Sequence, residues 1–151
     1  LADRHPTRME RYKAFRAEMQ FLDPDCRIDL IHESREEQTA PLLRHYFDTV
    51  DRLPDSILFL AGEFADTYRR ELLEPEPERY SGIGVLTFDH PQDQRFAHLD
   101  YHFDCIGFRS RNLLEWAEYY ITNRPMMKKR TPIHTLIEVR LEENGSIRMK
   151  P

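Results

Sequence analysis

The sequence predicts an α/β protein, with a mixed β-sheet covered by helices in a single domain over residues 1–151. In the first half of the chain, stretches with helical periodicity alternate with short stretches rich in β-forming residues, which is typical of strands joined by helices. In the second half, strand-like stretches follow one another in pairs. An α+β fold with a mainly antiparallel sheet is therefore the alternative.

The composition excludes several classes of protein. A content of 40% hydrophobic and 11% aromatic residues is too high for a disordered chain. A net charge of −5 argues against a general nucleic-acid or anionic-membrane binder. The longest apolar run, residues 57–61, is far shorter than the ~20 residues that span a bilayer. We expect a cytoplasmic protein with two free thiols, Cys26 and Cys105, one disulfide being the alternative.

Helices and strands alternate at the start of the chain. Apolar residues at helical spacing predict an amphipathic helix over 7–21 that lies on the core. Residues 26–31 alternate as a strand does. The next helix has the spacing of a capping box at Ser34, but a start at Thr39 places Pro41 in the first turn, where its missing N–H is tolerated. We therefore expect the helix to begin at Thr39.

Residues 55–74 allow two interpretations. They form either one helix opened by Pro54, or a buried strand over 56–61, a turn at Gly62 and a helix over 64–73. The proline before the apolar run and the glycine after it favour the strand.

A proline-rich connection over 74–78 should be solvated and stiff. Strands are predicted over 81–88 and 96–106, and then a helix capped by Ser110 or Asn112.

Two aromatic residues of that last helix, Trp116 and Tyr120, share a face, and we expect them to anchor it to the core. An exposed aromatic face that stacks on sugar rings is the alternative. The chain then predicts a strand over 133–141, a hairpin turn at the Asn-Gly pair of 144–145, and a short edge strand over 147–149.

Residues 96–106 carry the most distinctive chemical pattern. Side chains alternate between the two faces of a strand, so one face of this one suits a core, with Leu99, Tyr101, Phe103 and Cys105. The other face is a row of two imidazoles and two carboxylates, His98, Asp100, His102 and Asp104.

Three interpretations of this polar row are open. The commonest is the solvated face of an antiparallel strand. A second is general acid–base catalysis, in which a carboxylate orients an imidazole. A third is a divalent metal site. Four residues in a line cannot all reach one ion, so a zinc, manganese or iron site would combine two of them with a residue from elsewhere. The candidate ligands are His90, His98 and His102, with His32 or Glu33 as further partners.

A basic segment follows the last predicted helix. Four cations gather there on an otherwise acidic chain, and they could hold a phosphate or diphosphate group or form a solvated turn: Arg124, Lys128, Lys129 and Arg130. We therefore expect a small-molecule or sugar-phosphate ligand. The chain has no glycine-rich nucleotide loop, nucleophile elbow or zinc-protease motif.

Part of the chain resembles an uncharacterised glycosyltransferase-like family. The likeness rests on an amphipathic helix that runs into Leu-Pro-Asp at 53–55 and on the following Phe-Leu-x-Gly at 59–62. Ser34-Arg35-Glu36 is similar to the Gly-Arg-Glu that precedes that helix in the family, and residues 107–120 are similar to a later strand and helix. The family's donor-binding start is absent from this chain.

The resemblance implies a nucleotide-sugar-transferase type of α/β fold. In that case the polar row would supply a base or metal contacts, and the basic segment would face a diphosphate. The competing hypothesis is a non-catalytic binding or assembly domain, including a homo-oligomer, in which the polar row is only a surface.

Overall fold

The computed structural model describes residues 6–31, 38–89, 101–107, 110–123 and 139–147. Its centre is a four-stranded sheet in the order β1-β2-β3-β4, formed by Ser56–Phe59, Gly84–Phe88, Asp104–Gly107 and Arg140–Glu142. The first three strands are parallel, and β4 is antiparallel to β3. The sheet is thus mixed and mostly parallel. This confirms the α/β prediction over the mainly antiparallel alternative.

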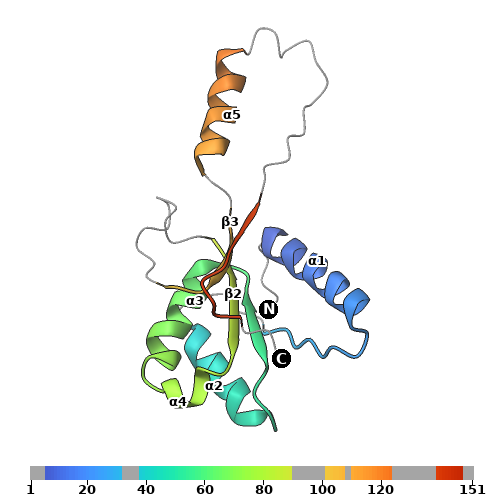
Figure 1. Cartoon of the computed structure of the whole chain (residues 1–151), viewed down its shortest axis with the longest axis vertical. Helices are drawn as coiled ribbons and strands as arrows, with labels where there is room; N and C mark the ends of the chain where they lie inside the picture. The colour runs from blue at the N-terminus through green and yellow to red at the C-terminus, as the bar shows by residue number, and fades with distance from the viewer. Residues whose placement is uncertain (1–5, 32–37, 90–100, 108–109, 124–138, 148–151) are drawn as a thin grey trace.

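Helices lie in the connection from β1 to β2 and in the connection from β3 to β4. In Figure 1, α2, α3 and α4 gather on one side of the strands and α1 lies on the other. A π-helical turn, η2, continues α3 directly, and α5 follows β3. The helical bounds in chain order are Pro6–Leu22 (α1), Thr39–Thr49 (α2), Gly62–Tyr68 (α3), Arg69–Leu73 (η2), Pro77–Tyr80 (α4) and Ser110–Thr122 (α5).

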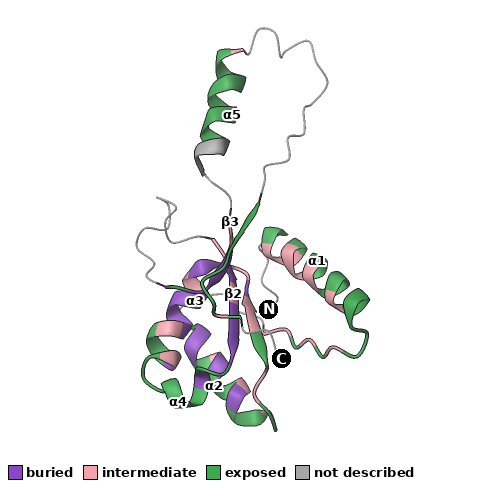
Figure 2. Cartoon of the chain, in the orientation of Figure 1, coloured by how far each residue is buried: buried purple, intermediate pink, exposed green. Residues whose placement is uncertain are grey.

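The core lies between the sheet and the α2–α4 side (Figure 2). Tyr68 is fully buried at its centre, and its ring centroid lies 5.5 Å from that of Phe59 and 6.3 Å from those of Tyr80 and Phe103. These rings come from β1, from the helices and from the approach to β3. Aromatic packing therefore connects the elements that the parallel strands bring together.

Two of the open alternatives are resolved by the structure. The second helix begins at Thr39, as the position of Pro41 predicts. Residues 56–59 form strand β1, so the strand interpretation of 55–74 is confirmed. The helix that follows begins at Gly62 rather than at residue 64, and in η2 the Glu74 N–H donates to the Arg69 carbonyl five residues back.

The strand predicted over 26–31 is wrong. Residues 26–31 have no regular structure, although Ile31 packs against the core. The segment is held instead by α2, because the Tyr46 hydroxyl donates to the Asp29 carboxylate at 2.7 Å. Alternation alone does not make a strand, which also needs a neighbour with free backbone groups. The 74–78 connection likewise leads into a short helix, α4, which buries Tyr80 completely.

The two outer helices pack less than their periodicity predicts. The stripe of α1 is only half-buried, and no residue of α1 is fully buried. The expectation that Trp116 and Tyr120 anchor α5 to the core is wrong, because their side chains are 39% and 51% exposed. The physical reason is position: α5 extends beyond the sheet, away from the four described strands (Figure 1).

The end of the chain departs from a simple hairpin. Strand β4 spans Arg140–Glu142, so it overlaps the strand predicted over 133–141 at residues 140–141, and residues 133–138 lie outside the described residues. Gly145 has a φ of +80°, the left-handed conformation that a turn glycine supplies. Beyond it, Ser146 bonds to the start of β2 instead of opening a strand at 147, and residues 148–149 are not described.

Both cysteines are free thiols, as expected. Across the described ranges, no helix is long and apolar enough to cross a membrane.

Candidate functional site at the carboxyl edge of the sheet

The carboxyl ends of β1 and β2 lie side by side because these strands are parallel and adjacent. In α/β sheets, ligands bind just beyond such ends, where loops rather than strands carry the side chains. Here that edge begins at Leu60 after β1 and at Asp89 after β2. We define the carboxyl-edge cluster as Arg11, Leu60, Phe88, Asp89 and Tyr101.

Asp89 has the most unusual backbone of the cluster. Its φ is +70°, which makes it the only described residue other than glycine with a positive φ. Aspartate tolerates this conformation better than most residues, and such positions concentrate at functional sites. Its N–H donates to the Ile106 carbonyl at 3.1 Å, and its own carbonyl accepts the Tyr101 hydroxyl. Two neighbouring segments thus fix the direction of the Asp89 side chain.

Arg11 joins the two strand ends from the α1 side. One guanidinium nitrogen donates to the Leu60 carbonyl at 2.8 Å, and the other lies 3.8 Å from the Asp89 carboxylate. The guanidinium also stacks on the Phe88 ring, 4.3 Å from its centroid. The Arg11 and Asp89 side chains are 25% and 15% exposed, so both are partly sheltered and still reachable from solvent. This favours a pre-organised carboxylate at a solvent-accessible edge.

Tyr101 holds the backbone at Asp89, because its hydroxyl donates to the Asp89 carbonyl. Burial, together with the neighbouring Cys105 and Asp89, raises the pKa of the Tyr101 phenol well above its ordinary value. The phenol therefore stays protonated and keeps donating to the Asp89 carbonyl. Burial also raises the pKa of the Cys105 thiol to about 11, with Glu142 and Asp104 adding to the effect. A fully buried, protonated thiol is no nucleophile.

The amino-terminal end of β3 is held by a different carboxylate. Asp104 is buried, and it accepts backbone N–H bonds from Asn144, from Gly145 at 2.8 Å and from Ile147 at 2.8 Å. Burial by itself would raise the pKa of this carboxyl, but the backbone N–H groups outweigh burial and lower it. We call Asp104 and residues 144–147 the carboxy-terminal clamp.

Ser146 completes the clamp between two strands. The Asp104 N–H donates to the Ser146 Oγ at 2.6 Å, and the Ser146 hydroxyl donates to the Val85 carbonyl at 2.6 Å. The hydroxyl therefore bridges β3 to β2 where the ladder between them begins. The Asp104 carboxylate accepts from backbone N–H groups of the chain itself, so these contacts are structural.

The polar row of the sequence is only partly described. His102 is exposed, whereas Asp104 is buried in the clamp, so these two members do not share a surface. The buried face is as predicted for Tyr101, Phe103 and Cys105. The other predicted site residues lie outside the described residues: His32, Glu33, His90, His98, Asp100, Arg124, Lys128, Lys129 and Arg130.

The described part of the chain does not assemble a metal site. Within it, no group of three or more His, Cys, Asp or Glu side chains is placed to hold an ion. The metal-ligand set of His90, His98 and His102 has one described member and stays a prediction.

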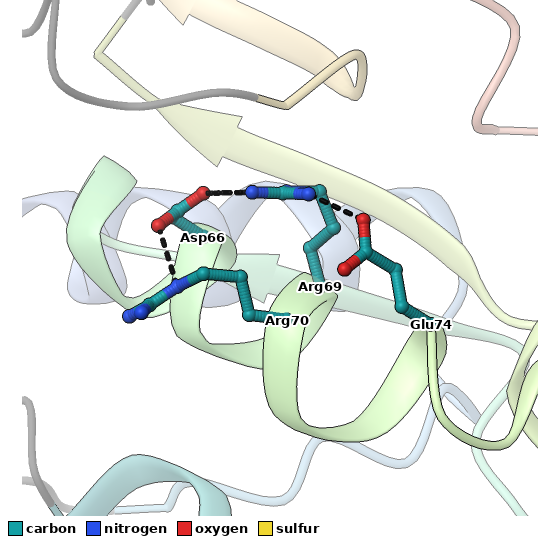
Figure 3. A network of polar contacts seen from close by, with 4 residues as sticks. All are labelled: Asp66, Arg69, Arg70 and Glu74. Atoms are coloured by element: carbon teal, nitrogen blue, oxygen red, sulfur yellow. Dashed lines mark hydrogen bonds and ion pairs between the residues drawn. The ribbon is translucent and has the colours of Figure 1, made fainter.

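A second polar cluster lies on α3 and η2 (Figure 3). The Asp66 carboxylate contacts Arg69 and Arg70, both at 3.0 Å, and Arg69 also pairs with Glu74. These four residues are close in the chain and surround the π-helical turn. The ion pairs join successive turns of one helix, so they stabilise the π turn rather than form a reaction centre.

Sequence reasoning missed Arg11 and Asp89. Arg11 belongs to the charged face of an amphipathic helix and has no local motif. Asp89 had a signal, because it directly follows a predicted strand, but only the parallel pairing of β1 with β2 makes that position an edge site. No protein-family model, curated protein or solved structure matches this chain.

Proposed function

We propose that this protein is a small transferase-like enzyme whose reaction centre is the carboxyl-edge cluster, with Asp89 as its catalytic carboxylate. The single observation that carries the proposal is Asp89, held at a positive φ beyond β2 and paired with Arg11. Ligands of α/β sheets bind beyond the carboxyl ends of the strands, and residues with uncommon backbone conformations cluster at active sites.

The substrate class follows from the resemblance of residues 34–62 to glycosyltransferase-like proteins, and we propose a nucleoside diphosphate sugar. In the transfer, an acceptor hydroxyl attacks the anomeric carbon, the bond from that carbon to the diphosphate breaks, and the hydroxyl proton passes to the Asp89 carboxylate. Arg11 is a positioning residue, since it holds that carboxylate against Phe88.

The remaining groups enter this proposal as predictions from the sequence. Asp100 and His102 are acid–base candidates on the approach to β3, and the basic segment at Arg124 and 128–130 is the candidate contact for the diphosphate. A departing diphosphate gains negative charge, which cations stabilise.

Replacing Asp89 by asparagine should lower turnover by about 100-fold or more, because the proton acceptor is lost while the shape of the side chain is kept. The melting temperature should stay close to that of the wild type, since the backbone bonds at residue 89 remain. The measurement is release of nucleoside diphosphate from a panel of nucleotide sugars, with Mg²⁺ and with EDTA.

The matched control is Asp55→Asn, at the opposite edge of β1, where the carboxylate is exposed and lies 2.9 Å from Arg52. That variant should keep full turnover. Wild-type turnover in Asp89→Asn, or no release from any sugar by the wild type, would overturn the proposal.

A specific observation favours a second candidate function, an assembly domain that docks through α5. Six large apolar side chains of this helix are exposed: Leu113, Leu114, Trp116, Tyr119, Tyr120 and Ile121. Exposed apolar patches of this kind mark interaction surfaces. An aromatic side chain buries about 150–250 Å², and a stable dimer needs about 800 Å² from each partner. The face is therefore of the right order for α5 of a second copy.

Leu114→Glu and Ile121→Glu, at side chains that are 67% and 71% exposed, should each raise the dimer Kd by about 100-fold, because each would bury an unpaired charge. Sedimentation velocity measures the Kd. The single tryptophan, Trp116, reports the same event, because its emission shifts to the red as the helix becomes exposed.

Phe21→Glu is the control for any loss of apolar surface, since Phe21 is 82% exposed on α1 and should leave the Kd unchanged. A wild-type chain that is monomeric at every concentration would rule out this candidate.

A further inference from the structure

The asparagine of the carboxy-terminal clamp is set in a reactive sequence. The chain has three asparagines, Asn112, Asn123 and Asn144, and only Asn144 precedes a glycine. Asparagine deamidates when the next backbone nitrogen attacks its side-chain amide, and a glycine there has no Cβ to obstruct that approach. Asn144 is therefore the asparagine whose covalent neighbourhood most favours the reaction.

Both nitrogen atoms of that reaction are held in the folded protein. The Gly145 N–H, the nucleophile once it loses its proton, donates to the Asp104 carboxylate at 2.8 Å. The Asn144 Nδ2, which would leave, donates to the Phe103 carbonyl at 2.8 Å. A carboxylate beside the Gly145 N–H opposes its deprotonation, and the bond to Phe103 fixes the Asn144 side chain.

Burial does not protect this site from solvent. Asn144 and Gly145 are both exposed, so water and hydroxide reach them in the folded state. The hydrogen bonds of the clamp, rather than burial, are what oppose the reaction. Opening of the clamp would remove both bonds at once, because the two acceptors belong to adjacent residues of the same segment.

We propose that Asn144 is a deamidation site gated by the carboxy-terminal clamp, so that it reacts only when the clamp opens. The Gly145 nitrogen loses its proton and bonds to the Asn144 Cγ, the bond from Cγ to Nδ2 breaks, and ammonia leaves. The resulting succinimide adds one water to give aspartate or isoaspartate. No oxidant or reductant takes part, and water is the only co-reactant.

The product works against reclosing of the clamp. A carboxylate at residue 144 has no N–H to offer the Phe103 carbonyl, and it adds a negative charge next to Asp104. Isoaspartate also adds a methylene to the backbone, which shifts the N–H groups of Gly145 and Ile147 away from the Asp104 oxygens. Deamidation therefore makes a transient opening permanent.

The test compares deamidation of the wild-type chain with and without guanidinium chloride at mildly alkaline pH. Mass spectrometry of the peptide that contains Asn144 gives the rate, and Asn112 and Asn123 serve as internal controls. We expect the native rate to be lower by about tenfold or more, because local opening precedes reaction. A native rate equal to the denatured rate would overturn the proposal.

A variant with a weakened clamp makes the test sharper. Ser146→Ala removes both hydrogen bonds of the Ser146 hydroxyl, the one that it donates to the Val85 carbonyl and the one that it accepts from the Asp104 N–H, and it leaves both nitrogens of the reaction in place. Its native rate should rise by about tenfold or more, as expected for the loss of two hydrogen bonds. A far-UV circular dichroism spectrum identical to that of the wild type establishes that only the clamp has changed. An unchanged native rate in this variant would contradict gating by the clamp.

Discussion

Asp104→Asn is expected to lower the free energy of unfolding by about 3 kcal/mol. The buried carboxylate accepts three backbone N–H bonds from residues 144–147, and asparagine offers one oxygen in place of two. Its amide nitrogen would also face a backbone N–H, which leaves a buried donor unpaired. Urea unfolding followed by far-UV circular dichroism measures the change. Tryptophan fluorescence is unsuitable because Trp116 lies on the exposed helix α5.

The difference in free energy of unfolding between the wild type and Asp104→Asn should depend on pH. The folded protein lowers the pKa of Asp104 from its ordinary value of 3.8, since the backbone N–H groups outweigh the opposing effect of burial. Its contribution to stability is therefore fully present above pH 3.8 and is lost as the pH falls through the folded pKa. The difference between wild type and Asp104→Asn should shrink in that acidic range. A difference that stays constant or grows on acidification would contradict the role of the charged form.

Tyr68→Ala is expected to lower the free energy of unfolding by about 3–5 kcal/mol, the range for deleting a fully buried aromatic ring. The ring contacts Phe59, Tyr80 and Phe103, so its loss leaves a cavity between the sheet and the helices. The cost arises in the core and should not depend on Asp104.

Tyr68→Phe is the matched control for this prediction. The Tyr68 hydroxyl lies 3.5 Å from the Tyr80 carbonyl, a long contact, so its removal should cost less than about 1 kcal/mol. Urea midpoints of the two variants separate ring packing from the hydroxyl bond. Equal losses in both variants would show that the hydroxyl, rather than the ring, stabilises this region.

Local rules predicted the elements whose signals are contained in a few residues. Pro41 located the start of α2, and Pro54 with Gly62 marked the ends of the stretch that holds β1. They failed where the outcome depends on a distant partner. Residues 26–31 alternate but form no strand, and the apolar side chains of α5 have the periodicity of a core helix but are exposed.

In the candidate site, too, local patterns predicted some residues correctly and failed for those that depend on distant partners. Alternation correctly predicted that Tyr101, Phe103 and Cys105 are buried. It also placed Asp104 in a polar row with His102, because it could not foresee the hydrogen bonds that Asp104 accepts from backbone N–H groups 40 to 43 positions further along the chain. Arg11 and Asp89 meet only because α1 and β2 are neighbours in space.

We propose that the carboxyl edge of the sheet is catalytic and that the amino-terminal end of β3 is structural. Nucleoside diphosphate release by Asp89→Asn and Asp104→Asn, at a temperature where both are folded, tests it most directly. We predict that Asp104→Asn turns over like the wild type and that Asp89→Asn loses about 100-fold or more. Turnover that is lost in Asp104→Asn and kept in Asp89→Asn would contradict the claim.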